Sequence, residues 1–286
     1  MCIQVSPQSK RHVSVLVRSL CTGVLLVVMS VMSVAPPFPT CAKPTTTIYF
    51  YSSETNINNF KSLKMEFDSY LAQFGPYEFQ PFRDRDTFEA QLAEKKDCVV
   101  LLSSWHYDNI RDHYGLRPVL IGARNGKTSQ KRLLVTKGNT THVDMVKIGQ
   151  IASASSVDYT QTILLEMFHD PEMVNKLKIL AVPKDIDALM SLGFGMAKSA
   201  ITTDYSLETL RKMNPALSQK ISIVAESHES RLLILAATKE YGKQTETVAS
   251  IFQKMAADPE GKRRIRMLGL EGWKAIDSSN KADGEN

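Results

Sequence analysis

The sequence contains few of the residues that cross-link a fold. Only four of the 286 residues are cysteines, and Cys2, Cys21 and Cys41 lie within the first 42 positions. The remaining cysteine, Cys98, lies in an apolar run, where it is expected to be a small core residue. Beyond position 42 no pair is left to form a disulfide, so this part of the chain must be held together by its core.

The sequence also has few patterns that carry catalysis. None of the six histidines has a partner at zinc-ligand spacing. His106 follows Ser103 and Ser104, but no G-x-S-x-G motif accompanies them. Gly193-Phe194-Gly195 is too short for a dinucleotide fingerprint. The sequence therefore predicts no catalytic residue, no metal site and no cofactor, and an enzyme is disfavoured.

Acidic residues are absent from the first 42 positions. Lys10, Arg11 and Arg18 precede an apolar run at 20–35, and a proline-rich stretch ends at Thr40-Cys41-Ala42. This order is typical of a secretory signal peptide cut after Ala42, which predicts a periplasmic protein. The apolar run is short for the roughly 20 residues that a membrane-spanning helix needs. An uncleaved signal anchor is the alternative.

A strong positive charge is lacking as well. Loss of the three leader cations lowers Lys plus Arg from 35 to 32, against 30 acidic residues. The cluster at 262–266 is the only basic candidate patch, and it is expected to be the solvated face of a helix. The sequence thus argues against a nucleic-acid partner. The length after the leader suits two lobes, and we expect a monomer.

Strands and helices alternate along the chain, which predicts an α/β fold. A strand at 45–51 runs into the polar loop 52–56, and a fully apolar strand at 98–102 runs into the polar loop 103–107. In such sheets, ligands lie beyond the carboxyl ends of the strands. Strands at 118–123 and 132–136 are predicted to form a hairpin that passes from the first lobe to the second. Other strands are expected at 77–82, 178–182, 199–202, 221–225 and 232–237, and Asp86 and Asp185 are expected to cap helices.

The most informative stretch is 148–168. A short strand there is followed by small hydroxyl residues and then a helix, whose start is marked by Ser155 and Asp158, the Ser-x-x-acid spacing of a capping box. A helix start carrying serines presents N–H groups and hydroxyls that attract an oxyanion. The alternative is that the serines only cap the helix. One apolar face is formed by Thr160, Ile163, Leu164, Met167 and Phe168.

Four stretches carry a resemblance to a known family. They are Tyr51-Ser52-Ser53-Glu54, the strand 97–103, the serine-rich stretch 153–160, and Asp258-Pro259-Glu260-Gly261 followed by 268–273. In this order and spacing the chain resembles the phosphate, phosphite and phosphonate-binding proteins of ABC importers (PhnD-type). These have the two-lobed periplasmic-binding-protein type II fold, in which each lobe is a mixed sheet flanked by helices.

The resemblance implies lobes at 43–126 and 127–222, joined by crossing hinge strands, with a return to the first lobe at 223–286. A small oxyanion would be held in the cleft by hydroxyls and backbone N–H groups. Trp105, Tyr107 and Tyr159 would wall the cleft. The positions implicated in binding are Tyr51, Ser52, Ser53, Ser103, Ser104, Ser153, Ser155, Ser156 and Thr160.

One position departs from the family pattern. An aspartate of the family's second lobe falls here on Lys198, which argues against a cationic ligand tail unless Lys198 simply faces water. Two functions follow from the resemblance. The first is a solute-binding protein that delivers an oxyanion to an ABC permease, and the second is a periplasmic sensor that signals to a membrane partner.

Overall fold

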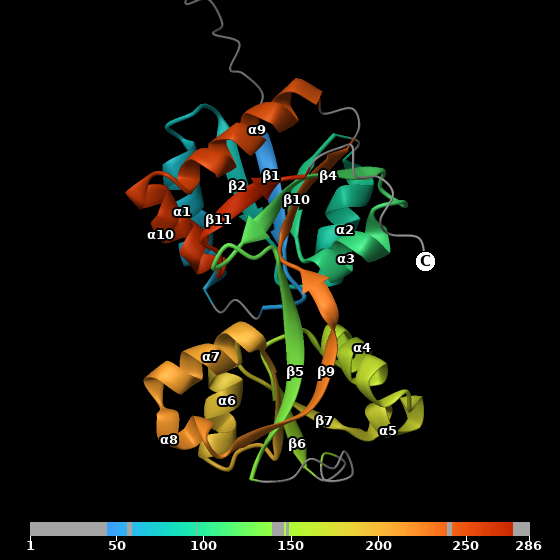
Figure 1. Ribbon diagram of the computed structural model, residues 1–286. Coiled ribbons are helices and arrows are strands. Elements are labelled where there is room, and N and C mark those ends of the chain that lie inside the picture. Colours follow the sequence, from blue (N-terminus) through green and yellow to red (C-terminus); the bar gives the residue numbers. More distant parts are fainter. Residues whose placement is uncertain are drawn as a thin grey trace, which may run out of the picture. The chain divides into compact units, whose positions relative to one another are not determined.

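The computed structural model describes residues 45–276 except 56–58, 96, 139–145, 147–148 and 239–241. The predicted signal peptide, residues 1–42, lies outside the described residues. Strands of the described part form two mixed sheets, each covered by helices on both faces (Figure 1). None of the helices described within these ranges is long and apolar enough to cross a bilayer.

The first sheet combines a parallel half with an antiparallel half. Its strand order is β11-β4-β10-β3-β1-β2, in which β1 pairs in parallel with β2 and β3, and the remaining pairs are antiparallel. The strands are β1 (Thr46–Tyr51), β2 (Tyr77–Pro81), β3 (Val99–Leu102), β4 (Leu116–Ala123), β10 (Ile234–Thr238) and β11 (Gly272–Ala275).

The alternation of side chains along β1 explains how both faces of this sheet are buried. Ile48 and Phe50 point into one apolar cluster, whereas Tyr49 and Tyr51 point into another. Helices α1 (Phe60–Leu71), α9 (Gly242–Met255) and α10 (Pro259–Met267) cover the first face, and α2 (Arg85–Glu94) and α3 (Ser104–Ile110) cover the second (Figure 1).

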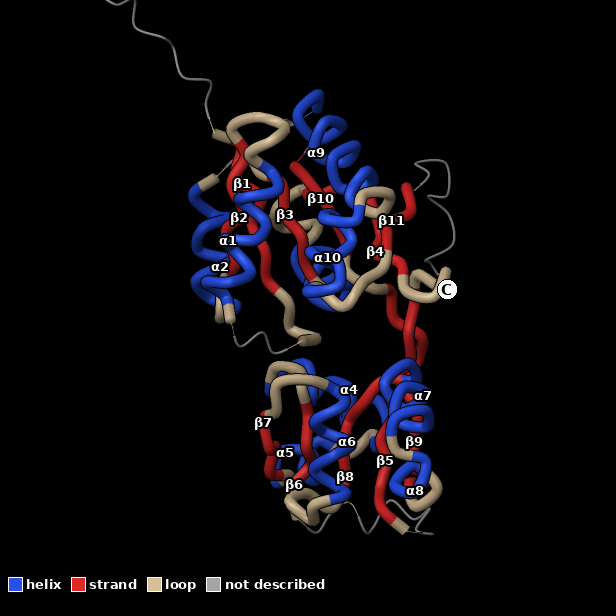
Figure 2. The backbone as a smooth tube through the Cα atoms, turned by 90° about the vertical axis from the view of Figure 1, so that its left-hand side faces the viewer, coloured by secondary structure: helices blue, strands red, loops and turns tan. Residues whose placement is uncertain are grey.

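The second sheet is built in the same way, with strand order β7-β6-β8-β5-β9. Leu133 and Val135 of β5 face one cluster, and Leu134 faces the opposite cluster. Figure 2 shows the helices packed along these strands. The elements are β5 (Ser129–Lys137), β6 (Gln150–Ser153), α4 (Val157–Phe168), α5 (Pro171–Lys176), β7 (Lys178–Ala181), α6 (Asp185–Gly193), β8 (Ser199–Thr203), α7 (Asp204–Met213), α8 (Pro215–Ser218) and β9 (Ile221–Arg231).

The chain passes between the sheets twice. The predicted hairpin at the first passage is wrong, because β4 and β5 pair within different sheets. Its turn exists nevertheless: Arg124 and Lys127 exchange backbone hydrogen bonds of 2.9 and 3.0 Å, and Asn125 and Gly126 adopt positive φ. At the second passage β9 remains paired with β5 as far as Arg231, so the boundary predicted at 222 falls within β9.

Helix starts differ from those predicted because a neighbouring side chain reaches the free N–H groups. Ser156, not Ser155, caps α4, and Asp84, not Asp86, caps α2 by accepting the Thr87 N–H at 2.8 Å. Asp185 is the first residue of α6 and has another partner, described below. The predicted loop 103–107 is mostly the first turns of α3.

Each residue of the stretch Asp258-Pro259-Glu260-Gly261 has a structural role at the start of α10. Asp258 caps α10 by accepting the Gly261 N–H at 2.8 Å, and Pro259 occupies the first helical position. Glu260 accepts a hydrogen bond of 2.7 Å from Arg264. A Cβ at Gly261 would lie 2.5 Å from the backbone of Met255, so α9 and α10 approach each other too closely for a side chain there.

We predict that Gly261→Ala lowers the free energy of unfolding by about 1–3 kcal/mol, because the backbone of Met255 must move. Gly242→Ala is the matched control. A Cβ at Gly242 meets no described atom within 4 Å, so this change is expected to alter stability by less than about 1 kcal/mol. Urea unfolding followed by circular dichroism measures both. Equal stabilities of the two variants would contradict the packing argument.

Candidate functional site

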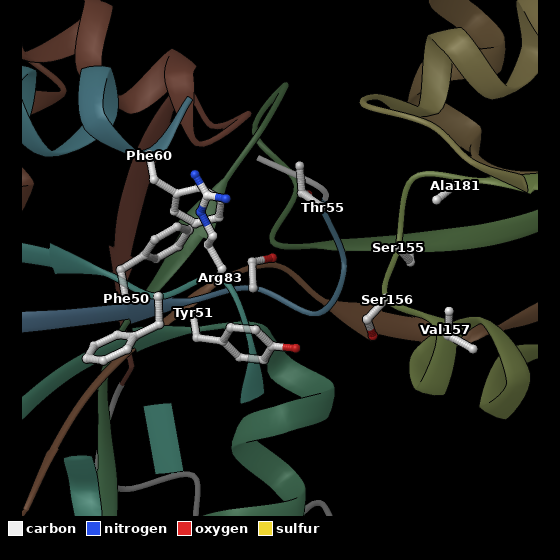
Figure 3. Close-up of a pocket in the computed structure, with 11 residues that line it drawn as sticks. Phe50, Tyr51, Thr55, Phe60, Arg83, Ser155, Ser156, Val157 and Ala181 are labelled. Atoms are coloured by element: carbon white, nitrogen blue, oxygen red, sulfur yellow. The ribbon is translucent and has the colours of Figure 1, made fainter. Parts of the chain in front are cut away.

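Loops from both sheets line a cavity of about 350 Å³. Figure 3 shows Phe50, Tyr51, Phe60 and Arg83 on the side of the first sheet and Ser155, Ser156, Val157 and Ala181 on the side of the second. Phe60 begins α1, and the other residues come from the carboxyl ends of parallel strands and from the start of α4, which is where the α/β fold was expected to place a ligand. The remaining lining residues are Ser52, Thr55 and Phe82.

Four of the residues predicted to bind ligand line this cavity: Tyr51, Ser52, Ser155 and Ser156. The Ser52 hydroxyl is buried and has no hydrogen-bond partner among the described residues. The Ser156 hydroxyl accepts the Tyr159 N–H at 3.3 Å and also forms a hydrogen bond with the Tyr51 phenol across the cavity. Burial raises the pKa of Tyr51, so its phenol remains a neutral donor.

The start of α4 and Arg83 bring positive charge to the cavity, while the carboxylates of Asp84 and Asp158 act on Tyr51 from nearby. Helix α4 is 12 residues long, and the first N–H groups of a helix have no acceptor within it. Together with the helix dipole they give the α4 end a partial positive charge. The exposed guanidinium of Arg83 adds a full positive charge and lies 5.6 Å from the centre of the Phe60 ring.

Other predicted hydroxyls bind one another instead of facing the cavity. Ser53 and Ser103 are both fully buried, and their Oγ atoms lie 2.6 Å apart. Ser104 donates at 2.7 Å to the carbonyl oxygen of Arg231. These contacts join the loop after β1 to the loop after β3 and to β9.

Ser153 and Thr160 form a second internal pair. Their hydroxyl oxygens lie 2.8 Å apart, and Thr160 also donates at 2.8 Å to the carbonyl oxygen of Ser156. Ser153 accepts the Ser155 N–H at 3.2 Å. This network fixes the β6–α4 loop. Ser153 and Thr160 therefore help to shape the cavity without lining it.

The three aromatic residues predicted to wall the cleft are not among the residues that line the cavity. Trp105 packs against Tyr159, with ring centres 5.4 Å apart. Tyr107 is 2% exposed and lies in the core between the first sheet and α3, because the helical geometry of α3 directs it there. The cavity's aromatic wall is supplied by Phe50, Phe60 and Phe82 instead.

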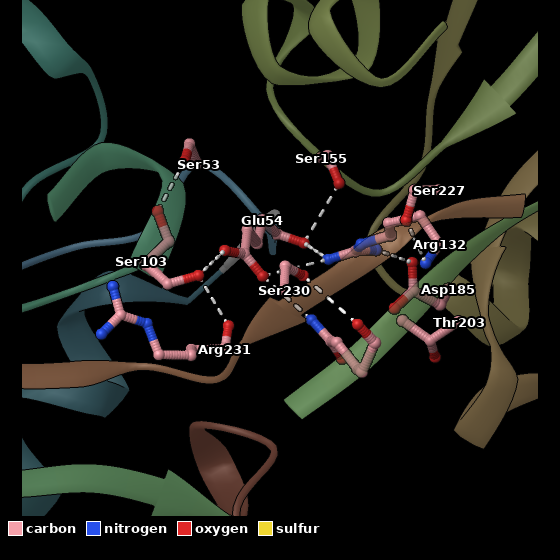
Figure 4. Close-up of polar contacts among 12 residues, drawn as sticks. Ser53, Glu54, Ser103, Arg132, Ser155, Asp185, Thr203, Ser227, Ser230 and Arg231 are labelled. Carbon is pink, nitrogen blue, oxygen red and sulfur yellow. Dashed lines mark hydrogen bonds and ion pairs between the residues drawn. The ribbon is translucent and has the colours of Figure 1, made fainter. Parts of the chain in front are cut away.

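A charged residue next to the predicted serines was not identified from the sequence. Glu54 is 4% exposed, and its carboxylate accepts hydrogen bonds from Gln130 at 2.9 Å and Ser104 at 3.4 Å. The Trp105 backbone N–H also donates to it. The backbone carbonyl of Glu54 accepts from Arg132 at 3.0 Å and Ser155 at 3.2 Å (Figure 4).

Arg132 lies at the centre of these contacts. Its side chain is 1% exposed, 3.0 Å from Asp185 and 3.5 Å from the Glu54 carboxylate, and its guanidinium lies 5.5 Å from the Tyr159 ring centre. Burial alone would lower the pKa of Arg132, but Asp185, Tyr159 and Glu54 hold the pKa above its usual range. Burial raises the pKa of Glu54, against the opposing effect of Arg132.

These contacts connect the two sheets. Glu54 follows β1 of the first sheet, whereas Gln130 and Arg132 belong to β5 and Asp185 begins α6, both in the second. A further bond of 2.7 Å runs from the Ser156 N–H to the Ser53 carbonyl. An arginine directly before Leu133-Leu134-Val135 is the sequence signal for this network, because an apolar strand rarely carries an unpaired charge.

His106 and Lys198 are not among the residues that line the cavity. No group of three His, Cys, Asp or Glu side chains suited to a metal occurs among the described residues. His106 is buried beside Glu89 at 2.8 Å, and burial lowers its pKa. Lys198 is exposed and precedes β8, at the strand end opposite to that of Ser155 and Ser156. It therefore faces water.

The sequence model of one protein family matches residues 69–280. The description of this family is "ABC transporter, phosphonate, periplasmic substrate-binding protein". The chain belongs to this family. It is thus a solute-binding protein of a transport family, not a member of an enzyme family, and the resemblance inferred from the four sequence stretches is confirmed. No match is found among the curated proteins.

Solved structures confirm the periplasmic-binding-protein type II fold. A binding protein component of an ABC phosphonate transporter from Pseudomonas aeruginosa has a TM-score of 0.59 at 13% identity, over 82% of this chain and 83% of that chain. PhnD1 from Prochlorococcus marinus in complex with methylphosphonate has a TM-score of 0.53 at 10% identity, over 82% and 94%. A Xanthomonas citri protein bound to ATP has a TM-score of 0.56 at 13% identity, over 82% of this chain and 92% of that chain.

We predict that Arg132→Met lowers the free energy of unfolding by about 3–5 kcal/mol, because Glu54 and Asp185 remain buried without their cation. Lys131→Met on the same strand is the matched control. Its ion pair with Glu226 is half-exposed at 3.2 Å, so its loss is expected to cost less than about 1 kcal/mol. Chemical unfolding of both variants measures the difference. Similar losses of unfolding free energy would show that the buried ion pair adds little to stability.

Proposed function

We propose that this chain is an exported solute-binding protein that captures a small oxyanion of the phosphate, phosphite or phosphonate type. One observation carries the proposal. The cavity between the two sheets combines the Ser52 and Ser156 hydroxyls, the amino end of α4 and the Arg83 guanidinium. This is the donor set that holds an oxyanion, and such donors act best when they are fixed before the ligand arrives.

The apolar part of the cavity suits the carbon substituent of a phosphonate. Phe50, Phe60 and Phe82 line one side, and Ala181 lines the other. A ligand that places its oxyanion at the α4 end can lay a short apolar group against these rings and remove their surface from water. The volume of about 350 Å³ is at the lower end for small-molecule sites, so it limits the ligand to a compact molecule.

Capture and release follow from the position of the cavity. Its walls come from both sheets, and the chain crosses between the sheets near Arg124–Lys127 and after Arg231. Rotation about these crossings would break the Ser156–Ser53 and Arg132–Glu54 contacts that connect the two sheets. It would separate Tyr51 and Arg83 from Ser155 and Ser156, and would expose the ligand to a membrane permease. The predicted leader at 1–42 would place the protein in the periplasm, where an ABC importer collects its substrate.

We predict that the purified protein binds methylphosphonate, phosphite or phosphate, and that Arg83→Ala weakens this binding about tenfold or more. The expected loss is that of one charge-assisted hydrogen bond. Isothermal titration calorimetry measures the dissociation constant. Arg117→Ala is the matched control, because Arg117 is an exposed arginine of β4 that is not among the cavity-lining residues.

Two results would contradict the proposal. One is the absence of binding to every member of a panel that also includes sulfate, which would favour a sensor or interaction protein on the same fold. The other is equal weakening by Arg83→Ala and Arg117→Ala, which would place the anion elsewhere on the surface.

A further inference from the structure

The Glu54 carboxylate is held as a bound ligand would be held. Its donors come from two elements. The Gln130 amide of β5 donates at 2.9 Å, and α3 supplies the Trp105 backbone N–H and the Ser104 hydroxyl at 3.4 Å, which also donates to the Arg231 carbonyl at 2.7 Å. The guanidinium of Arg132 lies 3.5 Å away and supplies the positive charge. An amide, a hydroxyl, a backbone N–H and an arginine together form a carboxylate-binding site.

The site is built independently of Glu54. Gln130 and Arg132 are two positions apart on β5, so both project from the same face of the strand. Asp185, at 3.0 Å, and the Tyr159 ring hold the guanidinium in place from the other side. The Arg132 Nε is buried and has no geometric hydrogen-bond partner among the described residues, and the Tyr159 side chain stabilises the same guanidinium.

We propose that the second sheet carries an inner anion site for a carboxylate, built by Arg132 and Gln130 and occupied by the chain's own Glu54. This site is separate from the cavity of about 350 Å³ that Ser155 and Ser156 line, which we call the outer cavity. The lining of the outer cavity includes neither Glu54, Gln130 nor Arg132. The inner occupant comes from the first sheet, so its binding holds the two sheets together (Figure 4). The proposal does not depend on which anion the outer cavity takes.

The inner site gives Glu54 a role in specificity. With Glu54 in place, the Arg132 cation is flanked by two carboxylates, those of Glu54 and Asp185. An incoming anion therefore meets no free positive charge there and is confined to the outer cavity at the α4 end. Without the Glu54 side chain, Arg132 would keep one carboxylate partner, and a space the size of acetate would open beside it.

Thermal unfolding of Glu54→Ala with added carboxylate tests the proposal. We expect the variant to have a lower Tm than the wild-type protein and to recover at least about 3 °C in saturating formate or acetate. Chloride at the same ionic strength serves as the salt control and is expected to recover less. The wild-type protein should not respond to formate, because its inner site is filled.

Glu78→Ala is the matched control variant, since Glu78 forms a half-exposed ion pair with Lys64 and neither residue lines the cavity. Equal responses of Glu54→Ala and Glu78→Ala to formate would overturn the proposal. If Glu54→Ala does not fold in plain buffer, the yield of folded protein on refolding with formate is compared with the yield in chloride, and equal yields count against the inner site.

This test separates the inner site from the proposed function. Rescue of Glu54→Ala by formate, together with no binding of any oxyanion by the wild-type protein, would support the inner site and reject oxyanion capture. The reverse outcome, binding by the wild-type protein without rescue of the variant, would support capture and reject the inner site.

Discussion

The buried contact between Glu54 and Arg132 is the constraint on which the rest of the site depends. Arg132 keeps its charge at any ordinary pH, and it lies within the structure with a 1% exposed side chain. A buried cation needs acceptors, and the acceptors here come from Glu54 of the first sheet and Asp185 of the second. The loop after β1 is thereby fixed against β5 and the β6–α4 loop.

The polar residues of the site have two roles: some fix the shape of the loops, and others line the cavity. Ser53, Ser103, Ser153 and Thr160 satisfy one another and give the loops their shape. Ser52 and Ser156 are among the residues that line the cavity, and Ser156 caps α4. A site for a small anion needs only a few donors directed at one point, provided that other residues hold those donors still.

The sequence was sufficient for the fold and for the family. Apolar runs such as 98–102, and the spacing of Asp258, Pro259 and Gly261, follow from local sterics and helix capping, which a single chain reveals. Strand partners were less accessible: β4 and β5 were predicted to pair because they are neighbours in sequence, whereas each finds its partner in a different sheet. The short strand β11 was not predicted, because its four residues carry no clear alternation of polar and apolar side chains.

In the site, residue types identified the correct loops but not which hydroxyl-bearing residues line the cavity. That distinction depends on pairs such as Ser53 and Ser103, fifty positions apart.

A crystal structure of the protein grown with methylphosphonate tests the central claim most directly, because it locates the anion and Glu54 at once. The account predicts the phosphonate beside Ser52, Ser156 and Arg83, with the Glu54 carboxylate still bound to Gln130 and Arg132. A phosphonate bound directly to Arg132, with Glu54 displaced from it, would contradict the account.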